Sequence, residues 1–368
     1  MEQNALNAQS SREEWLSRFC LPLLRWYERS ARVLPWREEP TPYRVWVSEI
    51  MLQQTRVSAV LPYFERFLAA LPDVASLAGA DPEALSKLWE GLGYYSRVRN
   101  LQRAAQVIME QYGGEFPRRY EQLRALPGIG DYTAGAVLSI AFNLPFPAVD
   151  GNVLRVLSRV CADKRDVTAP ALKREWAGLL KTIYPEGRAR DFTQALMELG
   201  AMVCLPNGEP QCLCCPVRES CEGFRLGLWS ELPYKPPKAP RKIEARTVLL
   251  LRHEGRVLLH RRAPGGLLGG LWELPNFEGA RTLSQLQASL EEYELSGCAL
   301  SPLGEAKHIF THLEWRMTGY LVTLPSPILL PQDYVWASLQ EVEEVYALPG
   351  AFKMYRSCLL YTSDAADE

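Results

Sequence analysis

The fold is decided by a short turn between two helical stretches, which reads LPGIGDYTA at residues 126–134. Glycines at the alternate positions Gly128 and Gly130 permit a tight turn whose backbone N–H groups point outward, at the start of a helix that opens near Tyr132. Together with the positive end of the helix dipole, such N–H groups can bind a phosphate group. Leu126, Gly128 and Gly130 are therefore candidate contacts to a DNA backbone, although any helix–turn–helix corner could use the same residues.

Apolar residues recur at three- and four-residue spacing on both sides of this turn, which is the pattern of helices with one buried face. Thr41-Pro42 and Asp81-Pro82 each supply an N-cap followed by proline at the first helical position. The predicted helices include residues 15–30, 43–71, 82–88, 101–112, 133–142, 152–161 and 170–184. We therefore expect an all-α domain over residues 1–229, which includes the hairpin and a cysteine-rich loop.

A change of composition marks a second domain. Residues 230–245, SELPYKPPKAPRKIEA, contain four prolines and four basic residues, and this composition favours an extended linker. Short β-like runs follow at residues 246–251, 255–261, 271–274, 315–323 and 334–337, with a helix expected over 283–295. They predict an α+β domain over residues 246–358. Residues 359–368 fit no periodic pattern and are expected to form a disordered tail.

The overall composition is that of an ordinary globular protein. Of the 368 residues, 47% are hydrophobic and 23% charged, and no run of about 18 apolar residues could span a membrane. The polar N-terminal stretch lacks the features of a secretion signal, so we expect a cytoplasmic protein. With 41 basic and 43 acidic residues, the chain could hold a nucleic acid only through local geometry, not through net charge.

Histidine is confined to the last third of the chain, at positions 253, 260, 308 and 312. The first 234 residues therefore cannot contain a Ser–His–Asp triad or a histidine-ligated metal. Chemistry in the helical domain must depend on carboxylates, tyrosine, lysine or a cysteine-bound metal.

Five of the nine cysteines fall within eighteen positions, at Cys204, Cys212, Cys214, Cys215 and Cys221. In a cytoplasmic protein such clustering indicates metal binding rather than disulfides. Four thiolates suit either tetrahedral zinc or a four-iron cluster, and the spacing alone does not separate the two. One ligand set is Cys204, Cys212, Cys215 and Cys221, which would clamp the end of the helical domain. Five unrelated buried thiols are the competing interpretation.

Two carboxylates are candidates for acid–base chemistry. Glu49 lies in WVSEIMLQQT (residues 46–55), on an apolar helix face where burial would raise its pKa and keep it protonated near neutral pH. Asp150, in VDGN (residues 149–152), directly precedes a helix whose dipole would keep a carboxylate ionised. One protonated and one ionised carboxyl is the arrangement that cleavage of a glycosidic bond needs. A solvated glutamate and a plain N-cap are the alternatives.

Taken together, LPGIG followed by Tyr-Thr-Ala, VDGNV, SEIMLQQT and the cysteine cluster resemble the helix–hairpin–helix DNA glycosylases related to endonuclease III. Within them the chain resembles the MutY family of adenine glycosylases, over about residues 13–358. The resemblance implies base-excision repair, in which adenine mispaired with 8-oxoguanine or guanine is flipped out of the duplex and removed. It also implies double-stranded DNA with that pair as the partner, no membrane, a nucleoid location and a monomer.

The same resemblance implies roles for individual residues. Glu49 would protonate the imidazole nitrogen of the purine and later help to activate water, and Asp150 would stabilise the oxocarbenium-like sugar. Tyr132 would support the developing charge, and Asn152 would position groups around Glu49. The other implied contacts are Arg37 and Gln194 on the adenine, with Gln54 and Tyr94 in the base stack.

A [4Fe–4S] cluster held by Cys204, Cys212, Cys215 and Cys221 is implied as well. The family usually has six residues between its first two cysteines, whereas Cys204 and Cys212 enclose seven. A one-residue loop insertion is compatible with ligation by Cys212, and Cys214 is then spare.

The second domain resembles the damage-reading domain of the same family, which is related to Nudix hydrolases, through HRRAPGGLLGGLWELPNFE at residues 260–278. A working Nudix hydrolase needs an acidic helix with an Arg-Glu pair to hold magnesium. The expected helix over 283–295 carries Glu291, Glu292 and Glu294 without that pair, so hydrolase activity is not expected. The segment HIFTH at 308–312 matches the hairpin that reads 8-oxoguanine, which implies Phe310, Thr311 and His312 as lesion contacts, with Thr311 in place of the usual serine.

Three rival functions follow from the residues. A glycosylase with lyase activity, or with thymine or uracil as its target, is the nearest. Such lyases carry a nucleophilic lysine after the hairpin, whereas Asp131 and Tyr132 follow Gly130 here, so we expect a monofunctional enzyme without strong lyase activity. The others are a nucleotide pyrophosphohydrolase that uses the second domain, and a silent DNA-binding module in which the carboxylates are only caps.

Overall fold

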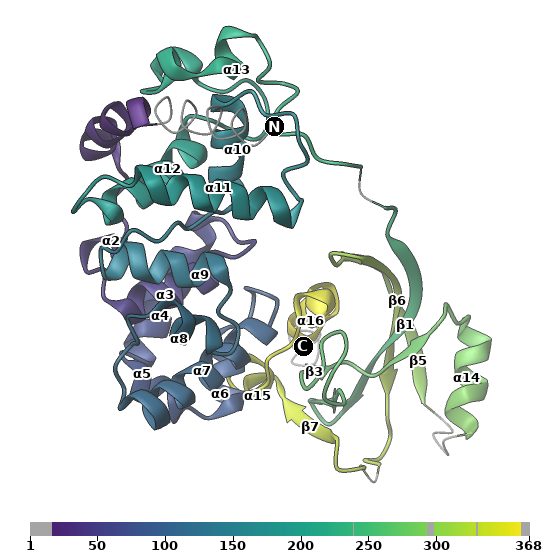
Figure 1. The fold of residues 1–368 in the computed structure, drawn as a ribbon. Coiled ribbons are helices and arrows are strands. Elements are labelled where there is room, and N and C mark those ends of the chain that lie inside the picture. The colour runs from purple at the N-terminus through teal and green to yellow at the C-terminus, as the bar shows by residue number, and fades with distance from the viewer. Residues whose placement is uncertain (1–16, 238, 293–297, 329, 362–368) are drawn as a thin grey trace. The chain divides into compact units, whose positions relative to one another are not determined.

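The chain forms two compact units in the computed structural model, which describes residues 17–237, 239–292, 298–328 and 330–361 (Figure 1). Within these ranges the first unit comprises the residues up to Gly79 and Asn100–Pro237. The second comprises Ala80–Arg99 and the residues after Pro237. Residues 80–99, expected in the helical domain, therefore group with the second unit. No described helix is long and apolar enough to cross a membrane.

The first unit is helical, as the periodicity predicts. A helix over residues 17–30 begins the described part of the chain, and residues 1–16 lie outside it. The further elements are α2 (Pro35–Glu38), α3 (Pro42–Leu52), α4 (Val57–Ala70), α5 (Val74–Ala78), α7 (Ser96–Tyr112, which begins in the second unit), α8 (Tyr120–Ala125), α9 (Asp131–Ala136), the π-helical turn η1 (Val137–Ala141), α10 (Gly151–Val160), α11 (Pro170–Ile183), α12 (Ala189–Met202), the 3₁₀ turns η2 (Cys212–Cys214) and η3 (Arg218–Ser220), and α13 (Glu222–Arg225).

Local sequence explains where these helices begin and end. Thr41 caps α3 by accepting a hydrogen bond from the Arg44 backbone N–H, with Pro42 at the first helical position. The single helix expected over 43–71 is instead α3 and α4, and this prediction was wrong at residues 53–56. The chain turns there because Gln54 adopts a positive φ of 60°, which a helix cannot accommodate. The break places Gln54 at the C-terminal end of α3, close in sequence to Glu49.

One core joins the helix over 17–30 with α10, α11 and α12 (Figure 1). Phe19, Leu157, Trp176 and Phe192 are almost completely buried in it. Fully burying one large apolar side chain contributes about 1.5–3 kcal/mol to stability. Packing of α10 in this core fixes the position of its first turn, where Asp150 lies.

The second unit is built on a seven-stranded sheet of order β3-β2-β1-β6-β5, with β4 paired to β1 and β7 paired to β2. β1 and β6 are parallel, and the other paired strands are antiparallel. The strands are β1 (Lys242–His253), β2 (Arg256–Arg261), β3 (Trp272–Glu273), β4 (Asn276–Glu278), β5 (Ala299–Ile309), β6 (Leu313–Thr323) and β7 (Tyr334–Ser338). The helices are α6 (Pro82–Leu88), α14 (Leu283–Glu292), α15 (Leu339–Glu344), the 3₁₀ turn η4 (Gly350–Phe352) and α16 (Lys353–Tyr361).

Alternation along β1 gives this sheet two apolar faces. Val248 and Leu250 pack with Tyr355 of α16, whereas Leu249 and Leu251 pack with Leu286 of α14. The two helices therefore cover opposite faces of the sheet (Figure 1). This is the α+β arrangement that the short strands predict.

Some expectations for the second unit differ from the structure. β1 begins at Lys242 and so takes in the last part of the expected 230–245 linker, because residues 242–245 pair with Leu313–Arg316 of β6. β5 was not expected. α16 continues to Tyr361, with Leu359 buried, so the expected tail is helical at 359–361, and residues 362–368 lie outside the described part.

Long-range hydrogen bonds from side chains connect residues 80–99 to the rest of the second unit, and the periodicity of the sequence does not predict such bonds. Lys87 Nζ donates to the backbone oxygens of Val342 and Tyr346, at 3.0 and 3.3 Å. The Glu90 carboxylate accepts from the Leu348 backbone N–H at 3.0 Å and from Arg356 Nη1 at 2.7 Å. These long-range contacts explain why the segment does not group with the helical unit.

Candidate active site

A cleft of about 1330 Å³ lies in the first unit, and four of the predicted site residues line it together. Glu49 comes from α3, Tyr132 from α9, Asp150 is the N-cap of α10, and Asn152 lies in its first turn. Arg37, Gln54 and Gln194 line the same cleft. Side chains up to 157 positions apart in sequence therefore surround one space.

Glu49 has the environment expected of a general acid. Its side chain is buried, and the Tyr132 hydroxyl donates a hydrogen bond to Glu49 Oε2. Burial is the main cause that raises the pKa of Glu49, to about 7, and the nearby Asp150 charge raises it further. The Tyr132 hydrogen bond and the Arg37 charge act in the opposite direction. Glu49 can therefore exchange a proton near neutral pH.

Asp150 is both the N-cap of α10 and a wall of the cleft. Its Oδ1 accepts from the Val153 backbone N–H at 2.7 Å, and its Oδ2 accepts from Asn152 Nδ2 at 2.8 Å. Burial raises the pKa of Asp150, whereas these hydrogen bonds and the Arg155 charge lower it. The helix dipole therefore does not by itself set the ionisation of this carboxyl, because burial acts in the opposite direction. Asp150 is therefore the N-cap of α10 and a residue of the cleft at the same time, so the two alternatives that the sequence left open do not exclude each other.

Asn152, which the resemblance expects to position groups around Glu49, is hydrogen-bonded to Asp150 and to Arg155. Its Nδ2 donates to Asp150, and its Oδ1 accepts from Arg155 Nη2 at 2.8 Å. Arg155, which sequence reasoning missed, also donates from Nε to the Cys204 backbone oxygen at 2.7 Å. A continuous chain of hydrogen bonds thus runs from the cleft to the backbone of the first clustered cysteine.

The hairpin has the tight geometry that its glycines predict. Gly128 has a φ of +74°, and a Cβ there would lie 2.7 Å from the Asn100 Cβ. Gly130 is the N-cap of α9, with a φ of −87°. Leu126 is buried, and its backbone oxygen accepts from Ile129 N–H at 3.2 Å. Only Gly128 therefore requires glycine for its conformation.

Four of the five clustered cysteines, Cys204, Cys212, Cys215 and Cys221, line one cavity of about 30 Å³ together with apolar side chains such as Val156 and Leu199. Cys214 is exposed, and its thiol donates to the Gln211 backbone oxygen at 3.3 Å. Burial raises the pKa of Cys215 to about 12 and that of Cys221 to about 11. Among the described residues, no three His, Cys, Asp or Glu side chains are arranged to hold a single metal ion.

The predicted lesion contacts lie in the second unit, in the turn between β5 and β6. Phe310 packs edge-on against Trp315, with ring centroids 5.0 Å apart, whereas Thr311 and His312 are exposed. Tyr94, expected in the base stack, lies in this unit as well, and its hydroxyl is 2.7 Å from Thr311 Oγ1. The structure therefore groups Tyr94 with the predicted lesion contacts, which the sequence did not suggest.

Tyr94 is held in a left-handed conformation, with a φ of 47°. Arg97 Nη2 donates to the Leu92 and Gly93 backbone oxygens at 2.9 and 3.1 Å, and its guanidinium lies over the Tyr94 ring. Trp89 Nε1 also donates to Gly93, at 3.1 Å. These contacts fix the loop that presents Tyr94.

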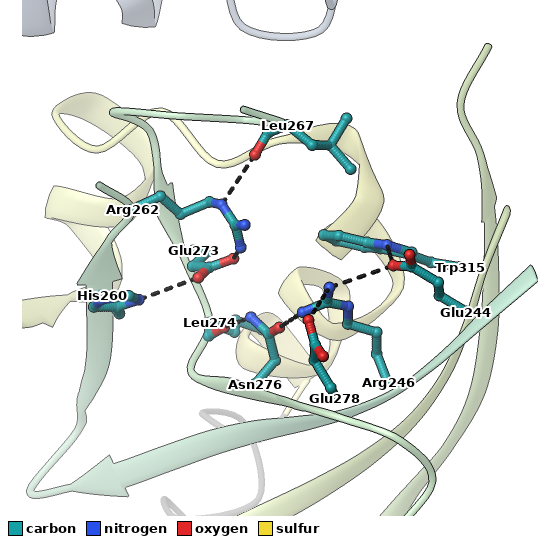
Figure 2. Close-up of polar contacts among 10 residues, drawn as sticks. All are labelled: Glu244, Arg246, His260, Arg262, Leu267, Glu273, Leu274, Asn276, Glu278 and Trp315. Carbon is teal, nitrogen blue, oxygen red and sulfur yellow. Dashed lines mark hydrogen bonds and ion pairs between the residues drawn. The ribbon is translucent and has the colours of Figure 1, made fainter. Parts of the chain in front are cut away.

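Polar contacts join side chains of the Nudix-resembling stretch to one another and to Arg246 of β1 (Figure 2). Buried Glu273 lies 3.1 Å from His260 Nδ1 and 2.7 Å from Arg262 Nη1. Arg246 stacks on Trp315 and lies 3.3 Å from Glu278. Glu294 and the side chains of Glu291 and Glu292 lie outside the described residues.

Comparisons with known proteins match two separate stretches of the chain to two family models. The model of the HhH-GPD superfamily of base excision DNA repair proteins matches residues 47–181, and that of the NUDIX domain matches residues 246–356. An adenine DNA glycosylase of Mus musculus is 35% identical, over 90% of this chain and 77% of its own length. That of Buchnera aphidicola (subsp. Acyrthosiphon pisum) is 32% identical, over 82% and 86%. The solved structure of a thermostable thymine-DNA glycosylase is 27% identical, with a TM-score of 0.53, and covers 59% of this chain and 99% of that one.

Proposed function

The chain belongs to the adenine DNA glycosylase family of the HhH-GPD superfamily, and on that premise we propose that it removes adenine paired with 8-oxoguanine or guanine by acid-assisted hydrolysis. Removal of adenine in base-excision repair follows from the family itself. The base opposite, the catalytic steps and action as a monomer are our proposals. The observation that carries the proposed chemistry is buried Glu49, hydrogen-bonded by Tyr132 in the cleft that Asp150 also lines.

In the proposed first step, protonated Glu49 donates its proton to the imidazole nitrogen of an extruded adenine. The proton makes the purine a better leaving group, so that the bond between sugar and base breaks and its electron pair remains on the base. The pKa of about 7 suits this step, because Glu49 is then partly protonated at neutral pH. Tyr132 keeps the carboxyl oriented.

In the second step, the ionised carboxylate of Asp150 faces the positive charge that develops on the sugar, as an ion pair or a covalent adduct. Hydrogen bonds from the Val153 N–H and from Asn152 support the ionised form. Water then attacks the sugar, and Glu49, now a carboxylate, accepts a proton from it. Glu49 thus acts first as the acid and then as the base within one turnover.

Arg37 and Gln194 are proposed to contact the adenine, and Gln54 to fill the base stack, because all three line the cleft. The exposed basic side chains Arg56, Lys173 and Lys235 line it too and would attract phosphate groups. The hairpin residues Leu126, Gly128 and Gly130 are proposed to bind a phosphate through backbone N–H groups. Phe310, Thr311 and His312, with Tyr94, are proposed to read 8-oxoguanine.

Cys204, Cys212, Cys215 and Cys221 are proposed to hold a [4Fe–4S] cluster, because their side chains share one cavity and Cys214 does not line it. Bound there, the cluster would cross-link the loop and supply an iron centre. Arg159 Nη1 donates to Cys204 Sγ at 3.4 Å and to the Leu205 backbone oxygen at 2.8 Å, which fixes the start of the loop. Enzymes related to endonuclease III generally carry such a cluster.

The proposed function is tested by single-turnover release of adenine from a duplex with adenine opposite 8-oxoguanine, with and without alkali. Wild type, Glu49→Gln and the control Glu65→Gln, which changes an exposed glutamate of α4, are compared at equal protein. Strand breaks that need alkali, persist in the control and vanish in Glu49→Gln are expected. Breaks without alkali would instead indicate a lyase, for which Lys173 and Lys235 are the amines in the cleft. No breaks at all would favour the silent DNA-binding module.

A further inference from the structure

Glu198, one turn after Gln194 on α12, is a fully buried carboxylate that lines the active-site cleft and has no role in the chemistry above. Its Oε1 accepts from the Arg32 backbone N–H at 3.0 Å and from Arg32 Nε at 2.7 Å. Its Oε2 accepts from Arg32 Nη2 and from Arg37 Nη2, both at 2.7 Å. Both carboxylate oxygens thus accept hydrogen bonds, and this acid binds two arginines that lie five residues apart in one segment and more than 160 positions away from it.

Arg37 is the more buried of the two, with a side-chain exposure of 13% against 34% for Arg32. Its Nη1 donates to the Arg32 backbone oxygen at 3.1 Å, and its guanidinium lies over the Tyr27 ring. Glu198, the Arg32 backbone and the Tyr27 ring thus hold the Arg37 guanidinium together. Without this acid, Arg37 would lose its ion pair and retain the contacts with the Arg32 backbone and the Tyr27 ring.

The positive charges of Arg32 and Arg37 explain why a buried carboxylate is stable at position 198. Burial raises the pKa of Glu198, but hydrogen bonds from Arg32 and Arg37 outweigh it and lower the pKa to about 2. Arg32, Arg37 and Tyr27 are the charged and titratable groups that face Glu198. Those that face Glu49 are Tyr132, Asp150 and Arg37. Arg32, Arg37 and Glu198 all line the cleft that Glu49 lines, and together they carry one net positive charge instead of the two that the arginines alone would carry.

We propose that Glu198 is a positioning residue for adenine excision, which fixes Arg37 toward the extruded base and offsets one of the two guanidinium charges in the cleft that Glu49 lines. The inference rests on the proposed function, because it assumes that Glu49 acts as the acid. Removing the negative charge of Glu198 should favour the ionised form of Glu49, whereas removing the charge of Arg32 should favour the protonated form.

The test is the pH profile of single-turnover adenine release from the adenine–8-oxoguanine duplex, with the full chain. Glu49 must be protonated, so the rate falls above its pKa. Glu198→Gln should move this fall to lower pH by about one unit, which is a tenfold loss of rate on the alkaline side. Arg32→Met should move it to higher pH. Glu198→Asp, which keeps the charge on a shorter side chain, should lower the rate without moving the fall.

Glu175→Gln is the matched control. Glu175 is an exposed glutamate of α11 that forms an ion pair with Arg165 at 2.7 Å, and it does not line the cleft. Its profile should equal that of wild type. Glu198→Gln leaves two arginines unpaired and could fail to fold, in which case Arg32→Met still gives the shift of opposite sign. Profiles that stay at the wild-type pH in the folded variants would overturn the inference. A wild type that releases no adenine would overturn the proposed function instead.

Discussion

At the scale of single residues, burial determines the chemistry of Glu49. A glutamate in water is ionised at neutral pH and cannot serve as an acid. The sequence predicts the raised pKa because Ile50 and Met51 flank the residue, and both are buried. It does not predict Tyr132 as the hydrogen-bond donor, since that residue is 83 positions away.

The pH dependence of the reaction follows from this burial. Because burial raises the pKa of Glu49 to about 7, its donatable proton is present below that pH and lost above it. The single-turnover rate of adenine release should therefore fall as the pH rises through about 7. Quenched single-turnover time courses across this range would measure the fall, and Glu49→Gln should release no measurable adenine at any of these pH values. A wild-type rate that increases through this range would contradict the assignment.

The two hairpin glycines should differ in their tolerance of a side chain. Gly128→Ala forces a positive φ of 74° and a collision with Asn100, and should destabilise the protein by about 1–3 kcal/mol. Gly130→Ala is the control, because its φ is −87° and a Cβ there would meet nothing within 4 Å. Thermal unfolding and duplex binding would measure both effects. Equal losses in the two variants would contradict this reading of the turn.

At the scale of elements, the short turn η2 determines which sulfurs face the cavity. A 3₁₀ turn over Cys212–Cys214 leaves Cys212 and Cys215 lining the cavity and exposes Cys214. The spacing alone left the ligand set open, because Cys214 and Cys215 are adjacent in sequence and a thiol at either position has the same chemistry. Which side chain points inward depends on the backbone path of the turn.

Replacement of these cysteines should therefore have unequal effects. Cys214→Ser should retain the broad visible absorbance and iron content of a [4Fe–4S] protein, and Cys212→Ser should lose both. Absorption spectra and iron analysis of the purified variants would measure the difference. Iron lost from Cys214→Ser and retained in Cys212→Ser would reverse the ligand assignment. A colourless wild type that contains zinc would overturn the cluster itself.

At the scale of the whole molecule, the two units do not follow the chain in simple order. The sequence predicts one helical domain over residues 1–229, and α6 and the loop after it do have helical patterning. Their buried side chains, including Leu85 and Trp89, nevertheless belong to the second unit. Patterning reveals that a segment has an apolar face but not which partner covers it.

A chain shortened to residues 1–237 should consequently not behave as an independent domain. The ion pair of Glu90 with Arg356 and the bonds of Lys87 to residues 342 and 346 would be lost. We expect a lower unfolding temperature and rapid tryptic cleavage after Lys87, Arg97 or Arg99. Limited proteolysis with mass spectrometry would locate the cuts, with the full chain as the control. Equal resistance of this segment in both proteins would contradict its assignment to the second unit.

The sequence by itself determined the all-α and α+β character of the two parts of the chain, most of their helices and strands, and the residue types that the proposed chemistry needs. Helical and strand periodicity, N-caps and the glycine-rich turn act over a few residues, so they are readable locally. Resemblance in the short motifs placed Glu49, Asp150, Tyr132 and the cysteines in one family, which the comparisons confirm. Only the tertiary structure decided the partners of these residues. Glu198 binds Arg37, Asn152 binds Arg155, and Tyr94 contacts Thr311. Such contacts depend on how the helices, strands and loops pack against one another, which the local sequence pattern does not contain.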